Sequence, residues 1–83
     1  MVAVRRLVLD VLKPHSPRLT TFTEQVTEAE SVAGATVSLV ELDQEVQTIK
    51  PTLEGENVAY DEVETIVEGL GATVPSIDEV SCG

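Results

Sequence analysis

The order of strand-like and helix-like stretches constrains the fold of this 83-residue chain more than any other feature. Four stretches are rich in β-branched residues or alternate apolar with polar side chains, which is typical of strands. They span residues 4–12, 36–42, 46–53 and 72–80. Two others repeat apolar residues every three or four positions, as amphipathic helices do: Leu19, Phe22, Val26 and Ala29 in the first, and Val63, Ile66, Val67 and Leu70 in the second. The sequence therefore predicts six elements in the order β-α-β-β-α-β.

This order places the chain in the α+β class. Two interleaved right-handed βαβ crossovers give a four-stranded antiparallel sheet in the order 4-1-3-2, with both helices on one face. That arrangement is the ferredoxin-like sandwich. The first strand then lies in the middle of the sheet, which agrees with its being the most hydrophobic run. We expect one domain spanning residues 1–83, because the chain is too short for a second.

Proline and glycine mark several expected boundaries. Ser16 followed by Pro17 predicts an N-cap and the first turn of a helix. Gly71 stands where a glycine after a helix C-terminus belongs. Pro75 is tolerated best if the last strand lies at an edge of the sheet.

The two faces of the first strand predict different roles. Leu7, Leu9 and Val11 alternate on one face, which suits contact with the helices. The other face lies on the side of the sheet that no helix covers, where a sheet that meets only water should be polar. We therefore predict a protein–protein interface there, formed by Val4, Arg6, Val8 and Leu12. The alternative is scattered apolar surface residues, which are ordinary.

Size also favours self-association. A chain of this length buries only about 60–65% of its unfolded surface, so its stability is marginal. Its one cysteine, Cys82, excludes an intramolecular disulfide, and a lone cysteine and a lone histidine cannot form a structural zinc site. Oligomerisation is the usual remaining way to supplement a small hydrophobic core. We expect a homo-oligomer.

The chain is very acidic, with a net charge of −10 from fifteen acidic and five basic residues. Such a surface repels itself at low salt and is typical of halophilic proteins, whose surroundings screen the charge. It also disfavours nucleic acid, which a basic surface must neutralise. The first apolar run is too short to span a membrane, and no signal-peptide pattern follows it. We expect a cytoplasmic protein in high salt.

Several charged side chains form candidate sites. Topology predicts Asp78 and Glu79 near Arg5 and Arg6, with the hairpin turn of residues 43–45 at the same end. These arginines would then be counter-charges to the carboxylates, or merely make exposed ion pairs worth about 0–1 kcal/mol.

A second candidate is a divalent-cation site at the opposite end of the sheet. Asp10, Glu54 and Glu56 supply the oxygen ligands that calcium prefers, so Ca²⁺ is the candidate cofactor. No EF-hand spacing exists, and most acidic loops are simply solvated.

A third candidate is an anion site at the start of the first helix. Lys13, His15, Ser16 and Arg18 surround the expected helix N-terminus, whose amides and dipole favour an anion. A capped surface loop is the alternative. No catalytic motif is present: no Walker loop, no dinucleotide loop and no HExxH. We expect a protein that is not an enzyme.

Three stretches, residues 5–15, 34–56 and 76–80, resemble the small archaeal family called domain of unknown function 211. The resemblance implies a ferredoxin-like fold, an archaeal source, ring-like or larger homo-oligomers and calcium-linked assembly. Two residues depart from the family pattern. Pro51 interrupts a third strand that is usually unbroken and implies a bulge, and Ala59 replaces an acidic or capping residue before the second helix.

Two functional hypotheses follow. The first is a self-associating, non-enzymatic module whose assembly responds to cations that bridge or screen carboxylates. The alternative is a regulatory domain that binds a small anion or metabolite at the first helix N-terminus or a subunit interface.

Overall fold

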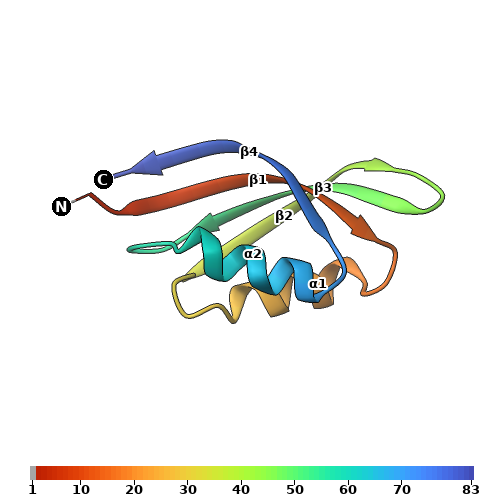
Figure 1. Ribbon diagram of the computed structural model, residues 1–83, viewed down its shortest axis with the longest axis horizontal. Coiled ribbons are helices and arrows are strands. Elements are labelled where there is room, and N and C mark those ends of the chain that lie inside the picture. The colour runs from red at the N-terminus through yellow and green to blue at the C-terminus, as the bar shows by residue number, and fades with distance from the viewer. Residues whose placement is uncertain (1) are drawn as a thin grey trace.

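A four-stranded antiparallel sheet carries both helices on one face (Figure 1). The computed structural model describes residues 2–83. The elements are β1 (Val4–Pro14), α1 (Leu19–Thr27), β2 (Gly34–Leu42), β3 (Val46–Glu54), α2 (Tyr60–Gly69) and β4 (Thr73–Cys82). The strand order is β2-β3-β1-β4, which is the predicted order read from the other edge. The ferredoxin-like α+β fold is therefore confirmed.

The core lies between the sheet and the two helices. The side chains that alternate on β1, namely Leu7, Leu9 and Val11, are at most 2% exposed. They meet apolar side chains from both helices and from β3 in one cluster, which includes Phe22, Val26, Ile49, Leu53, Val63 and Val67. Complete burial of such a side chain contributes about 1.5–3 kcal/mol. The predicted core faces of β1 and both helices are therefore confirmed.

The start of α1 differs from the prediction. Helix α1 begins at Leu19, and Arg18 occupies the N-cap position in extended backbone without a side-chain cap. The N-cap predicted at Ser16 is therefore wrong, because residues 15–17 form a bend before the helix. At the end of α2 the prediction holds: Gly71 has a φ of 86°, a conformation that glycine adopts without strain.

The N-terminus of α2 is capped from a distant segment. Ala59 offers no side-chain cap, but its amide donates to the Ser31 hydroxyl at 3.0 Å. In return the Glu62 carboxylate accepts the Ser31 amide at 3.1 Å, the Ser31 hydroxyl at 2.6 Å and the Glu30 amide at 3.2 Å. These hydrogen bonds from Ser31 lower the pKa of Glu62. The turn after α1 and the first turn of α2 thus stabilise each other, which compensates for the alanine.

Proline has different effects in the two strands that contain it. Pro51 lies buried in the central strand β3, whose pairing with β1 keeps one register throughout. The bulge expected at Pro51 is therefore absent. Register shifts occur instead in β2, between Leu39 and Glu41, and along the pairing of β1 with β4. Pro75 lies in β4, which is an edge strand as predicted.

Candidate functional site

The uncovered face of the sheet is polar and internally paired. The Arg6 guanidinium forms an ion pair with Glu79, as predicted, and the Lys50 ammonium lies 3.3 Å from the Asp78 carboxylate. The Ser76 hydroxyl donates to Asp10 at 2.8 Å. Both basic side chains in these ion pairs are therefore matched by carboxylates of the same chain.

The four residues predicted as an interface on this face have different environments. Val8 is only 4% exposed, and Arg6 is engaged with Glu79. Val4 packs against the core, and the pairing irregularity between Val4 and Arg6 accounts for this change of side. Leu12 is 39% exposed. Of the four, only Leu12 offers a partner a large apolar surface.

The structure does not bring together the three residues predicted to bind a divalent cation. Glu54 pairs across the sheet with Arg6, near the start of β1, whereas Asp10 lies four residues further along that strand. Glu56 lies in the loop after β3. Within residues 2–83 no three acidic, histidine or cysteine side chains are grouped closely enough to hold a metal. The prediction placed Asp10 of β1 and Glu54 of β3 at the same end of the sheet. The antiparallel register of these two strands separates the two carboxylates.

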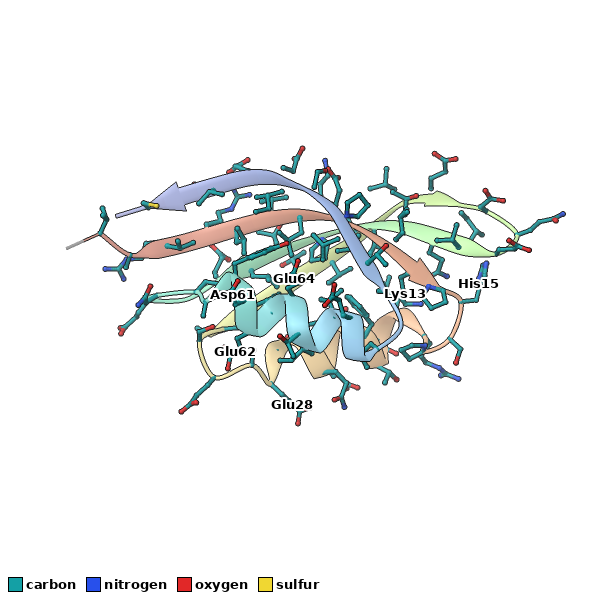
Figure 2. All side chains as sticks on the ribbon, in the orientation of Figure 1. Lys13, His15, Glu28, Asp61, Glu62 and Glu64 are labelled. Atoms are coloured by element: carbon teal, nitrogen blue, oxygen red, sulfur yellow. The ribbon has the colours of Figure 1, made fainter. Side chains whose placement is uncertain are left out.

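The hairpin turn also lies at the other end of the sheet from the one predicted. The His15 Nε2 lies 2.8 Å from the Asp43 carbonyl oxygen, so the turn adjoins the end of β1 (Figure 2). Arg5 at the opposite end donates instead to the Gly83 carbonyl at 3.3 Å. The prediction that residues 43–45 lie near Arg5 and Arg6 is therefore wrong, because β3 runs away from the turn toward those arginines.

The predicted anion site is not assembled either. Lys13 is fully buried on the helix side of the sheet, and its ammonium donates to the Pro14 carbonyl at 2.7 Å. His15 is directed to the hairpin turn, and Ser16 and Arg18 are exposed. The four side chains therefore do not converge on one ligand position.

Lys13 is the least expected feature of the core. It continues the alternation of Leu7, Leu9 and Val11, so a longer strand would have predicted its inward direction. Burial lowers the pKa of its ammonium group. Its cross-strand neighbour is Gln47, whose Oε1 is buried without a hydrogen-bond partner. A cation thus lies in the core without a carboxylate beside it.

Exposed large apolar side chains gather on the two edge strands. They are between 45% and 63% exposed and comprise Leu39, Val40 and Leu42 on β2 and Ile77 and Val80 on β4. Residues directly opposite each other in a ladder share a face. Leu39 pairs with Ile49, Leu42 with Gln47, Ile77 with Leu9 and Val80 with Leu7. We call Leu39 with Leu42 the β2 row and Ile77 with Val80 the β4 row. Both rows lie on the side of the sheet that carries the helices, but the helices do not cover them.

The β2 row could not be predicted from simple alternation. Strict alternation places Leu39 and Leu42 on opposite faces, since they are three residues apart. The register shift between Leu39 and Glu41 inserts one residue and brings both onto the helix side. No sequence signal marks this bulge.

A groove lies beside the β2 row, between α1 and β2. It has a volume of about 610 Å³ and is lined by Leu19, Thr20, Thr23, Glu24, Thr27, Glu28 and Val37. Of these lining residues, Glu28 at the C-terminal end of α1 is labelled in Figure 2. The candidate functional surface therefore comprises the groove and the rows on the two edge strands.

Comparison with known proteins assigns the chain to a family. Residues 5–83 match the family model for domain of unknown function 211, described as "Uncharacterized ArCR". The chain belongs to this family. It is also 42% identical, over all 83 residues and 86% of the relative's length, to the uncharacterized protein MJ0319 of the archaeon Methanocaldococcus jannaschii. Neither description names an enzymatic activity. No helix within residues 2–83 is long and apolar enough to cross a membrane.

Proposed function

We propose that this member of the family is a non-enzymatic module that associates head to tail, with β2 of one copy beside β4 of the next. The observation that carries the proposal is the pair of exposed apolar rows on opposite edges of one sheet. The setting that fits the acidic composition is a high-salt cytoplasm.

Strand direction is compatible with this contact. The order β2-β3-β1-β4 is antiparallel throughout, so β2 and β4 run in opposite directions. Two copies in the same orientation can therefore extend one antiparallel sheet, with the β2 row next to the partner's β4 row on the helix side. A head-to-tail contact generates a ring if its rotation closes and a filament if it does not.

The edges carry Pro75 in β4 and a register shift in β2, but they lack another common protection against pairing. Natural edge strands often carry lysine, which opposes addition of another strand. Neither β2 nor β4 contains a lysine or an arginine. The acidic residues of β4, Asp78 and Glu79, are already paired with Lys50 and Arg6 on the opposite face. Association would bury the rows and supplement a small core.

Cations strengthen the proposed assembly because like charges approach in it. Helix α1 packs against β2 and α2 against β4, so α1 of one copy lies toward α2 of the next. Glu24 lies in α1 and Glu28 is its C-cap residue, and α2 carries Asp61, Glu64 and Glu68. Potassium would screen these carboxylates, whereas calcium could bridge them between copies.

Light scattering coupled to chromatography tests the proposal. The mass should exceed that of one chain in high potassium chloride and fall toward it at low salt. Calcium bridging predicts a further rise with calcium that a chelator reverses. Leu39→Asp should dissociate the assembly, whereas Ser38→Asp, on the other face of the same strand, should leave it intact. A monomeric wild-type chain under all these conditions would rule out the proposal.

A further inference from the structure

The groove beside α1 has the size and lining of a small-molecule site. Its volume of about 610 Å³ lies within the 300–1,000 Å³ typical of ligand pockets. Its apolar part comes from Leu19, Val37 and threonine side chains. Val37 belongs to the first half of β2, ahead of the exposed row. The groove therefore needs an explanation separate from the pairing of sheet edges.

The threonines of the groove present an apolar surface. The Thr23 hydroxyl donates to the Leu19 carbonyl at 2.8 Å, and the Thr27 hydroxyl donates to the Thr23 carbonyl at 2.7 Å. Both hydroxyl protons are therefore used within the helix. What these side chains offer a ligand is chiefly their γ-methyl groups.

The charged lining residues of the groove are both acidic. Glu24 and Glu28 are exposed and stand four residues apart, which places them on one side of α1, about 6 Å apart along its axis. The two ion pairs found among residues 2–83 involve other carboxylates. Like charges at this spacing repel each other. A cation bound between the two carboxylates would reduce this repulsion.

We propose that this groove binds a linear aliphatic diamine or polyamine. Its methylene chain would lie on the methyl groups of the threonines and on Leu19 and Val37, and its ammonium groups would pair with Glu24 and Glu28. Ammonium groups separated by a few methylenes match the distance between two carboxylates one helical turn apart.

Other occupants match this lining less well. A bare divalent ion takes six or more oxygens and gains nothing from apolar walls, and no third ligand-bearing side chain joins these two carboxylates within the described chain. A second copy brings no basic residue on either edge strand. Charge and apolar surface together favour an aliphatic cation.

NMR titration of the ¹⁵N-labelled chain with 1,4-diaminobutane and with spermidine, at constant ionic strength, tests the proposal. Amide shifts should concentrate on residues 19–28 and at Val37. Binding should be at least about fivefold tighter than that of Mg²⁺, which has the charge but no methylene groups to bury. The neutral analogue 1,4-butanediol should not bind.

Matched variants locate the site. Glu24→Gln and Glu28→Gln should each weaken binding about two- to fivefold, the effect of one exposed ion pair. Glu68→Gln is the control, because Glu64 and Glu68 form an equally spaced acidic pair on α2 outside the groove lining. Shifts spread equally over both helices, equal affinity for Mg²⁺, or no effect of Glu28→Gln would each overturn the proposal.

At low salt, where the wild type should be monomeric, the titration should give the same result in the wild type and in Leu39→Asp. Binding in a chain that never assembles would uphold the groove and refute the head-to-tail contact. A chain that assembles but binds no diamine would uphold the head-to-tail contact and refute the groove as a binding site.

Discussion

Replacement of Lys13 by methionine should stabilise the fold. Lys13 has no exposed surface, no carboxylate within ion-pair distance and one hydrogen bond, to the Pro14 carbonyl. An ammonium group has three donors, so two lie buried without a described partner. Each unsatisfied buried group costs about 1–3 kcal/mol, more when charged. Methionine keeps the length of the side chain and removes this cost, so we expect a gain of about 1–3 kcal/mol.

The pH dependence of stability gives a second readout of the same variant. The pKa of Lys13 is lowered in the folded state, so the unfolded chain binds more protons between the folded and unfolded pKa values. Wild-type stability should therefore rise with pH as pH passes from the folded pKa to the unfolded one. Lys13→Met should lose this rise.

Denaturant and thermal unfolding at fixed potassium chloride measure the effect. A gain of 1 kcal/mol corresponds to about 4–8 °C in Tm for a domain of this size. Lys50→Met is the matched control, because Lys50 is partly exposed and its pairing with Asp78 is worth about 0–1 kcal/mol. A loss of stability in Lys13→Met larger than that in Lys50→Met would refute the reasoning, since it would mean that the buried ammonium is well satisfied.

Two other substitutions test local features of the fold by the same unfolding measurements. Glu62→Gln should lower the free energy of unfolding at pH values above the unfolded pKa of glutamate. The difference in stability from wild type should shrink as pH falls through the lowered folded pKa of Glu62, because protonation removes the same charge. A stability difference that does not change with pH would contradict the role of the Ser31 hydrogen bonds. Gly71→Ala should cost about 1 kcal/mol of stability, since alanine is strained at a φ of 86°. Gly69→Ala should be neutral or stabilising, because Gly69 lies in α2 with open space around it. Equal effects of the two substitutions would argue against the left-handed turn.

Much of the fold could be predicted because periodicity and topology agree. The alternation of Leu7, Leu9 and Val11 and the stripe of Phe22 and Val26 point to the core that the structure shows. The order of elements then leaves few ways to arrange the sheet. Even the pairing of Arg6 with Glu79 follows, because β4 runs antiparallel to β1.

The candidate functional surface was harder to predict because it depends on register. The bulge after Leu39 moves Leu42 to the helix side, and the irregularity near Arg6 moves Val4 toward the core. A one-residue shift reverses every later side chain of a strand. The residues of the predicted cation site are kept apart for a related reason, because the register of β1 and β3 separates Asp10 from Glu54.

The capping of α2 illustrates a compensation that local sequence cannot show. Ala59 looks unsuitable before a helix, yet Ser31, 28 residues earlier, accepts its amide hydrogen. Only the folded arrangement places that hydroxyl at the helix start. Departures from a local pattern therefore do not by themselves argue against the element that follows.

A mixing experiment tests the head-to-tail contact most directly. Leu39→Asp blocks the β2 edge and Val80→Asp blocks the β4 edge, so each variant alone should be monomeric in high potassium chloride. Mixed in equal amounts, they should form a complex of two chains, because each keeps the edge that the other needs. Light scattering that shows only monomers after mixing, while the wild type assembles, would contradict the head-to-tail arrangement.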